Sequence, residues 1–280
     1  MSSKVRLDAE LVRRGLARSR EQAAELIGDG RVAVAGLTTG KPATQVGRDM
    51  PITVSDGAGP DYVSRGGHKL AGALAAFAAR PGPAGPGPAG PGTGVTVDGR
   101  RCLDAGASTG GFTDVLLRAG AKHVVAVDVG YGQLAWALRN DPRVTVLERV
   151  NVRQLRPEQV APPPGLVVAD LSFISLAIAL PALMGCAEPD ADFVLLVKPQ
   201  FEVGKGRVGP GGVVRDPALR AEAVADVARA AAKLGLGVAG VTASPLPGPA
   251  GNVEYFLWLR RGAPPLDDGD LGQAIASGPQ

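Results

Sequence analysis

The chain has 280 residues, of which 45% are hydrophobic and 20% are charged, enough for one large domain, or a large and a small one, with a substantial core. Its net charge of +3 permits nucleic-acid binding without requiring it. Only two cysteines are present, Cys102 and Cys186, which excludes a zinc cluster and a disulfide framework, so we expect no metal site and a reducing cytoplasm.

Nothing in the sequence indicates a membrane protein. The first residues, MSSKVRLDAELVRR, carry charges where a signal peptide has an apolar core. The longest apolar segment, residues 173–187, is too short to span a bilayer and contains Pro181. We therefore expect a soluble protein with no membrane partner.

Residues 6–27 predict two short helices, the second of which begins at Ser19 with Gln22 in the capping-box position. Short strands are predicted over residues 32–34 and 52–54. This order of elements, with LVRRGLARSREQAAELIGDGRVAVAG running through it, resembles the S4 RNA-binding domain. The resemblance implies a small α+β RNA-binding domain over residues 1–57.

Positive charge is concentrated in this first segment, where residues 4–20 carry two acids, Asp8 and Glu10, against six basic side chains. Guanidinium groups bind phosphate oxygens through paired hydrogen bonds, so the basic face fits an RNA backbone, although a plain solvated helix surface gives the same pattern. The expected RNA-binding residues here are Lys4, Arg6, Arg13, Arg14, Arg18 and Arg20.

A glycine- and proline-containing cluster predicts a linker over residues 58–64. The next helix carries an apolar stripe, and Lys69 lies beside that stripe near the helix start. Residues 80–94 alternate proline and glycine, which favours neither helix nor sheet, so we expect a surface insertion there. From residue 95 onward, strand and helix patterns alternate, which predicts a parallel sheet with crossover helices over residues 65–262.

A buried strand containing Val95, Val97 and Cys102 is predicted to arrive at Asp104, followed by a glycine-rich turn over residues 106–111 and a helix. The spacing D-x-G-x-x-x-G-G does not fit the G-x-G-x-x-G of dinucleotide folds. It resembles motif I of S-adenosylmethionine (SAM) methyltransferases, although a purely structural glycine turn gives the same pattern.

Two later strands extend this candidate cofactor site. Asp128 ends the second strand at close to the ~20-residue spacing from Asp104 that is expected of a ribose-binding carboxylate. Asn151 and Val152 follow the third strand, where an amide and an apolar side chain suit an adenine ring; a turn asparagine is the alternative. The expected cofactor-binding residues are Asp104, Gly106, Ser108, Thr109, Gly110, Gly111, Phe112, Asp128, Val129, Asn151, Val152 and Asp170.

Charged residues also end the fourth and fifth predicted strands, at Asp170 and Lys198. Ligands of open parallel sheets bind outside the carboxyl ends of the strands, so this row of charges predicts a site. The glycine-rich loop over residues 199–215 suits an RNA backbone as a cationic flap, or else is disordered. Two final strands are predicted over residues 238–243 and 254–259, and residues 263–280 are expected to form a disordered tail.

Six segments, YVSRGGHKL, LDAGASTGGFTD, VDVGYGQL, ADLSFISL, VKPQFEVGKG and GNVEYFLWL, resemble the TlyA family in family order over residues 4–260. The resemblance implies a Rossmann-like, seven-stranded, FtsJ-like methyltransferase domain joined to the S4 domain, SAM as cofactor, and 2′-O-methylation of cytidine in the 16S or 23S RNA of ribosomal subunits by a monomer. It also implies a catalytic tetrad of Lys69, Asp170, Lys198 and Glu254. Arg65, Lys205 and Arg207 complete the expected RNA contacts.

The tetrad leaves two roles open for Lys198, because a lysine desolvated beside Lys69 can act as a general base, whereas a charged lysine stabilises a developing alkoxide. An ordinary buried ion-pair network is the structural alternative. Rival functions are a nicotinamide oxidoreductase, a methyltransferase of small hydroxyls or proteins, and a membrane-active hemolysin without methyltransferase activity, of which the last is the main alternative.

Overall fold

The protein is described here from a computed structural model, which covers residues 4–28, 31–54, 62–78 and 94–279. It divides into two compact units, Met1–Ser64 and Arg65–Gln280. Most of the expected insertion at residues 80–94 and most of the expected linker at residues 58–64 lie outside the described residues. No helix in the described parts of the chain is long and apolar enough to cross a membrane.

The first unit contains the two helices and short strands that its sequence predicts. Leu7, Leu11 and Ile27 are fully buried in its core, and the Ser19 hydroxyl accepts a hydrogen bond from the Gln22 backbone N–H at 3.1 Å, as a helix cap does. Strand β1 pairs with β4, and β2 pairs with β3 and β5, all antiparallel. The elements are β1 (Lys4–Arg6), α1 (Leu7–Arg13), α2 (Arg20–Gly28), β2 (Val32–Val34), β3 (Leu37–Thr38), β4 (Gln45–Gly47) and β5 (Ile52–Val54).

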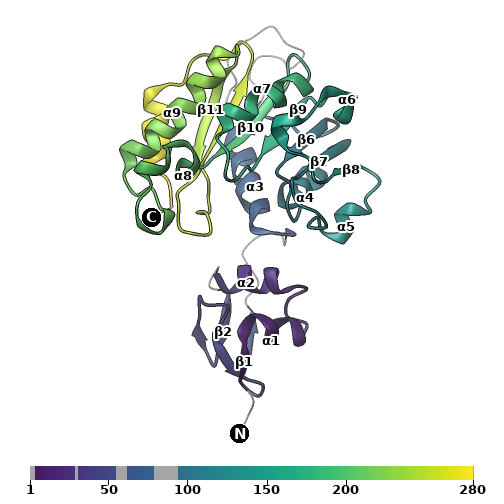
Figure 1. Ribbon diagram of the computed structural model, residues 1–280, viewed down its shortest axis with the longest axis vertical. Helices are drawn as coiled ribbons and strands as arrows, with labels where there is room; N and C mark the ends of the chain where they lie inside the picture. The colour runs from purple at the N-terminus through teal and green to yellow at the C-terminus, as the bar shows by residue number, and fades with distance from the viewer. Residues whose placement is uncertain (1–3, 29–30, 55–61, 79–93, 280) are drawn as a thin grey trace. The chain divides into compact units, whose positions relative to one another are not determined.

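The second unit is built around a seven-stranded sheet in the order β11-β12-β10-β9-β6-β7-β8 (Figure 1). Strands β8, β7, β6, β9 and β10 run parallel, while β12 is antiparallel to both β10 and β11. This order confirms the expected Rossmann-like α/β class. The strands are β6 (Arg101–Ala105), β7 (His123–Val127), β8 (Val144–Leu147), β9 (Leu166–Ala169), β10 (Asp192–Val197), β11 (Gly237–Ala243) and β12 (Tyr255–Arg260).

Helices cover both faces of this sheet because its central strands are buried on both sides. On one face, α7 and α9 pack on alternate strand residues such as Leu103, Val167 and Leu195. On the other face, Phe77 of α3 contacts Trp258 and Phe112 of α4 contacts Phe256, with ring centroids 5.8 and 6.0 Å apart. The helices are α3 (Arg65–Ala78), α4 (Gly111–Arg118), α5 (Trp136–Arg139), α6 (Pro157–Val160), α7 (Leu176–Cys186), α8 (Pro199–Glu202), α9 (Pro217–Lys233) and α10 (Asp268–Ala276).

Two expectations from the sequence are wrong. The first strand of this sheet begins at Arg101, because a turn at residues 98–99 separates it from Val95 and Val97, which are buried without joining the sheet. The tail at residues 263–280 is not disordered as far as it is described. Residues Asp268–Ala276 form α10, whose apolar Leu271 and Ala274 pack into the core beside β11; the many Gly, Pro and Asp residues hide this short apolar stripe.

Replacing Leu271 with alanine tests the role of α10. Its side chain is 8% exposed and contributes to the main core, so the substitution removes buried apolar volume. We expect Leu271→Ala to lower the free energy of unfolding by about 2 kcal/mol or more, measured by urea denaturation. A variant as stable as the parent chain would contradict the packing of α10.

Candidate functional site

The strand register gathers the candidate residues at one edge of the sheet. Ala105 pairs with both Val127 and Ala169, so the residues that follow these strands, Gly106, Asp128 and Asp170, emerge side by side. On the far side of β10, Val197 pairs with Tyr255 in antiparallel β12. Lys198 after β10 and Glu254 before β12 therefore lie at the same carboxyl edge, where open α/β sheets bind ligands.

The glycine turn after β6 is tied to Asp128. Gly106 has φ of 88°, and a Cβ there would lie 2.4 Å from the Asp170 carbonyl oxygen, so both its backbone conformation and its close approach require glycine. The Asp128 carboxylate accepts hydrogen bonds from the backbone N–H groups of Ser108 at 2.8 Å and Gly130 at 2.6 Å. Each carboxylate oxygen keeps a second lone pair for a ligand hydroxyl.

A cavity of about 610 Å³ opens at this edge of the sheet. Its size is that of a typical cofactor pocket. Seven of the residues expected to bind cofactor line it: Gly106, Ser108, Asp128, Val129, Asn151, Val152 and Asp170. It is also lined by residues that the sequence analysis did not single out, namely Gly130, Gln133, Val150, Arg153, Leu171, Ser172, Phe173 and Ile174.

The other expected cofactor residues lie outside the lining of this cavity. Thr109 accepts a hydrogen bond from Ala135 through its carbonyl oxygen, and Gly110 and Gly111 begin α4. Phe112 is 3% exposed and packs on Phe256. These residues support the turn from its core side and do not face the cavity. The reason is that α4 starts immediately after the turn and directs its first side chains into the core.

Asp104 is fully buried and lies one residue before the end of β6, not at the open edge. Its Oδ2 accepts a hydrogen bond from the Thr113 hydroxyl at 2.7 Å. Burial raises the pKa of Asp104 to about 7; the Thr113 bond opposes the shift, and the negative charges of Asp170 and Asp128 add to it. Asp104 thus supports the turn and is protonated in mildly acidic solution.

The four residues of the expected tetrad form two ion pairs. Lys69 Nζ lies 2.6 Å from Glu254 Oε2, with side chains 8% and 1% exposed. Lys198 Nζ lies 2.6 Å from Asp170 Oδ1 and donates a hydrogen bond to Ser172 Oγ at 2.9 Å. A lysine in the first turns of a helix is disfavoured by the helix dipole. In α3, the buried Glu254 carboxylate offsets this cost for Lys69.

An exposed aromatic side chain, Phe173, lies at the cavity rim. Phe173 is 91% exposed, has φ of 64°, and lies against the ring of Phe201, with ring centroids 5.1 Å apart. Neither Ser172 nor Phe173 was expected from the sequence, where only Asp170 marked the end of this strand. The signals available for them were a serine two residues after Asp170 and the segment ADLSFISL of the family resemblance.

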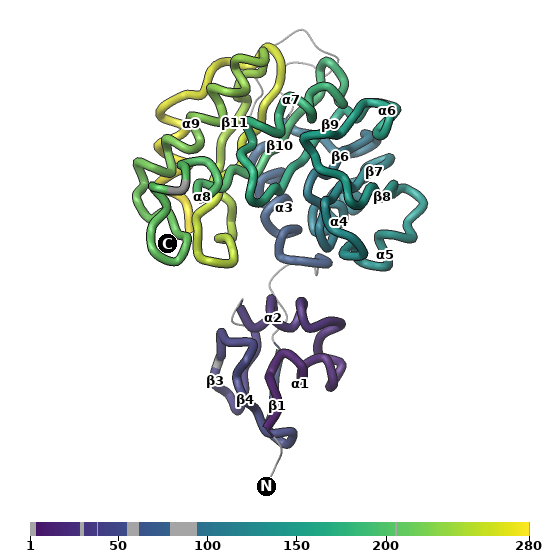
Figure 2. Tube along the Cα trace, viewed as in Figure 1, coloured from purple at the N-terminus to yellow at the C-terminus, as the bar shows by residue number. Residues whose placement is uncertain are grey.

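Two of the three expected RNA contacts of the second unit, Arg65 and Arg207, are engaged within it. The Arg65 guanidinium donates a hydrogen bond to the Pro247 carbonyl oxygen at 3.1 Å, and Arg207 forms an ion pair with Glu222. The side chain of Lys205 lies outside the described residues. The loop between β10 and α9 is also folded (Figure 2): Asn252 accepts a hydrogen bond from Val214 N–H and donates one to the Gly212 carbonyl oxygen.

Two buried carboxylates hold most of the arginines of the first unit. Asp8 pairs with Arg6 and Arg20 at 2.8 and 3.0 Å, and hydrogen bonds from these partners hold its pKa far below its usual range against the cost of burial. Glu10 pairs with Arg13 and Arg14 at 2.5 and 2.7 Å, and their hydrogen bonds lower its pKa to about 2.

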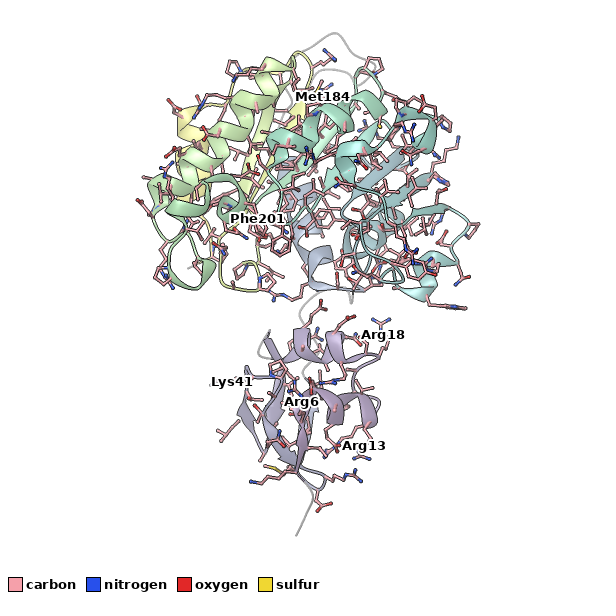
Figure 3. The ribbon with its side chains drawn as sticks, in the orientation of Figure 1. Arg6, Arg13, Arg18, Lys41, Met184 and Phe201 are labelled. Atoms are coloured by element: carbon pink, nitrogen blue, oxygen red, sulfur yellow. The ribbon has the colours of Figure 1, made fainter. Side chains whose placement is uncertain are left out.

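The arginines differ in how much of the side chain stays exposed. Arg6, Arg13 and Arg20 are 46%, 51% and 60% exposed, and Arg18 is exposed and donates to Gln22 Oε1 at 3.4 Å. Figure 3 labels Arg6, Arg13 and Arg18. Arg14 is only 20% exposed, because it also donates to the carbonyl oxygens of Arg48 and Met50. Arg14 is thus a structural link, while exposed Lys4 and the other arginines present charge to solvent.

Known proteins resemble this chain over its whole length. Residues 62–261 match the FtsJ-like methyltransferase family, and residues 5–52 match the S4 domain. A Mycobacterium tuberculosis protein named 16S/23S rRNA (cytidine-2′-O)-methyltransferase TlyA is 61% identical over 285 residues, covering 100% of both chains. YqxC of Bacillus subtilis, named as a candidate rRNA methyltransferase, is 43% identical over 92% of this chain and 86% of its own. The solved structure of a candidate hemolysin from Streptococcus thermophilus is 36% identical, with a TM-score of 0.74 over 99% of this chain and 96% of that one.

The high pKa of Asp104 gives a stability prediction. The folded state holds a proton on Asp104 that the unfolded state releases near its ordinary pKa of 3.8, so the contribution of Asp104 to stability falls as pH rises from about 4 to about 7. Neutral Asp104→Asn removes this loss. We expect the stability of Asp104→Asn relative to the parent chain to increase from pH 5 to pH 8 in urea denaturation.

The matched control for this measurement is Asp141→Asn. Hydrogen bonds from Arg143 lower the pKa of Asp141 from its ordinary value, so the variant gives no such change between pH 5 and pH 8. Equal pH dependence in the two variants would contradict a buried, protonated Asp104.

Proposed function

The chain belongs to the TlyA family and carries an FtsJ-like methyltransferase domain, and from this membership we propose that it transfers a methyl group from SAM to the 2′-hydroxyl of cytidine in ribosomal RNA. The observation that carries the proposal is the meeting of the Asp170–Lys198 ion pair and the glycine-turn cavity at one edge of the sheet. The cavity wall includes Asp170 and Ser172, both of which contact the Lys198 ammonium group.

The residues that line the cavity fit SAM chemically. Asp128 offers carboxylate lone pairs at the position of a ribose-binding acid, and Asn151 and Val152 offer an amide and an apolar surface for a base. The carboxylate of Asp170 provides negative charge beside a cationic ligand. When bound, SAM supplies the electrophilic methyl group; the protein supplies binding, orientation and charge.

We assign Lys198 the role of stabilising negative charge on the ribose oxygen. An ammonium group has three donors, and Asp170 and Ser172 occupy at most two of them, so one remains for a substrate oxygen. Both contacts use the Lys198 amino group as a donor, to the Asp170 carboxylate at 2.6 Å and to the Ser172 hydroxyl at 2.9 Å, and a donor group directed in this way supports charge stabilisation over general-base catalysis. The buried Lys69–Glu254 pair holds α3 against the start of β12, beside this group.

The first unit fits the RNA substrate. Three of its exposed arginines, Arg6, Arg13 and Arg20, are held by Asp8 and Glu10, so their guanidinium groups are ordered before RNA arrives and lose less conformational freedom on binding. Phosphate contacts of this kind position RNA without reading its sequence. The choice of nucleotide then belongs to the shape of the ribosomal subunit and to the geometry of the methyltransferase site.

Methyl transfer from labelled SAM to unmodified ribosomal subunits, followed by mapping of the modified ribose, tests the proposal. We expect label on a cytidine 2′-oxygen with the parent chain. Lys198→Ala is expected to lose transfer by about 100-fold or more while SAM binding, measured by calorimetry, persists, because Lys198 does not line the cavity.

The variant Lys198→Arg separates the two roles of the lysine. Arginine keeps the positive charge but cannot give up a proton, so measurable residual transfer supports charge stabilisation. Full activity of Lys198→Ala, or methylation of a base instead of the ribose, would refute the proposed reaction.

RNA binding by the first unit is tested by the salt dependence of affinity. Replacing both Arg18 and Arg20 with glutamine leaves Arg6 on Asp8, and we expect it to weaken binding and to reduce the slope of log affinity against log salt by about 2. Arg14→Gln is the control, expected to lower stability with an unchanged slope, because Arg14 bonds to Glu10 and to backbone carbonyl oxygens. An unchanged slope in the double variant would contradict these phosphate contacts.

A further inference from the structure

Two short chain segments support the Asp170–Lys198 pair, residues 170–175 after β9 and residues 198–202 after β10. The two segments contact each other in three places. Lys198 contacts Asp170 and Ser172, Phe201 packs on Phe173, and Glu202 binds the end of the first segment. The third contact, made by Glu202, has no direct part in the chemistry of methyl transfer.

Both carboxylate oxygens of Glu202 are bonded to the start of α7. The Ser175 hydroxyl donates to Oε2 at 2.6 Å, and the Leu176 backbone N–H donates to Oε1 at 2.9 Å. Ser175 itself caps α7 by accepting a hydrogen bond from Ala177 N–H at 3.2 Å. Glu202 therefore fixes the point at which residues 170–175 enter the helix.

The segment that Glu202 holds is strained. Phe173 has φ of 64°, a left-handed conformation that costs free energy in any residue other than glycine. Such a conformation persists only where surrounding contacts determine it. Phe173 is 91% exposed, so the main contacts that maintain its backbone come from the two ends of the segment and from the Phe201 ring.

We propose that Glu202 is a positioning residue for methyl transfer, which clamps residues 170–175 so that Asp170 and Ser172 hold the Lys198 ammonium group in place. The clamp itself follows from the hydrogen bonds of Glu202. Its effect on methyl transfer rests on the proposed function. Glu202 acts indirectly, through the segment that it binds. A small shift of that segment would matter, because a displacement of about 1 Å in a catalytic group costs up to about 100-fold in rate.

Two variants of Glu202 test the clamp. Glu202→Ala removes both bonds to α7, and we expect its kcat to fall between about 10- and 100-fold at saturating SAM and RNA. RNA affinity is expected to stay unchanged, because the arginines of the first unit are untouched. Glu202→Gln keeps the shape, with an oxygen for Leu176 N–H and an amide that donates to Ser175, and is expected to retain kcat within about twofold.

The matched control for lost stability is Asp267→Ala. Asp267 caps α10 through a hydrogen bond from Asp270 N–H at 2.9 Å and takes no part in the site, so its loss lowers stability without changing kcat. Ser175→Ala removes one bond of the clamp, and adding it to Glu202→Ala is expected to cause little further loss in kcat, because both variants disrupt the same unit.

Hydrogen exchange of the Leu176 amide and of residues 171–175 gives a readout independent of activity. We expect exchange there to accelerate in Glu202→Ala and not in Glu202→Gln or Asp267→Ala. A kcat of Glu202→Ala equal to that of Asp267→Ala, unchanged exchange in Glu202→Ala, or equal impairment of Glu202→Gln would overturn the proposal. Absence of methyl transfer by the parent chain would refute the proposed function, while accelerated exchange would still support the clamp.

Discussion

The placement of β10 between a parallel and an antiparallel neighbour is the constraint on which the site depends. Because β9 runs parallel to β10, Asp170 and Lys198 both follow the carboxyl ends of their strands. Because β12 runs antiparallel to β10, Glu254 precedes its strand at that same edge. A parallel β12 would place Glu254 at the opposite edge, where Lys69 of α3 would lose its partner. One reversed strand thus brings four charged groups from distant parts of the chain together.

The buried charges of the site are costly to the fold. An ion pair as enclosed as Lys69–Glu254 loses hydration on both sides, and removing one partner from such a pair typically destabilises a protein by about 3–5 kcal/mol. The Glu254 carboxylate is also closely packed, because a Cβ on Gly248 would lie 2.5 Å from its Oε1. It therefore has little room to move away from Lys69. The Asp104 carboxyl responds differently, by holding a proton to near pH 7. The charges at the carboxyl edge of the sheet are kept and paired, whereas the carboxyl beneath the glycine turn holds a proton in mildly acidic solution.

The first unit handles charge on a similar principle. Asp8 and Glu10 are almost fully buried; Asp8 contacts the exposed Arg6 and Arg20, and Glu10 contacts the exposed Arg13 and the mostly buried Arg14. The carboxylates order these side chains, and the remaining donors face solvent. The basic face is therefore less positive than its six cations suggest, and three of its arginines are held in a fixed orientation. Within it, Arg14 bonds inward to the β4–β5 loop.

The order of elements could be predicted from residue patterns alone, because hydrophobic periodicity, the Ser19 cap and the glycine spacing after Asp104 are local signals. The row of charges after successive strands could be predicted in the same way. The packing of α10 in the core, the start of β6 at Arg101 and the direction of Phe112 away from the cavity could not, because each depends on contacts in the folded chain. Contacts between segments far apart in sequence were equally hidden, as with Lys69 and Glu254, which are 185 positions apart, and with Glu202 and α7. Such contacts depend on strand order and on which face a helix presents, and no local pattern of residues encodes either.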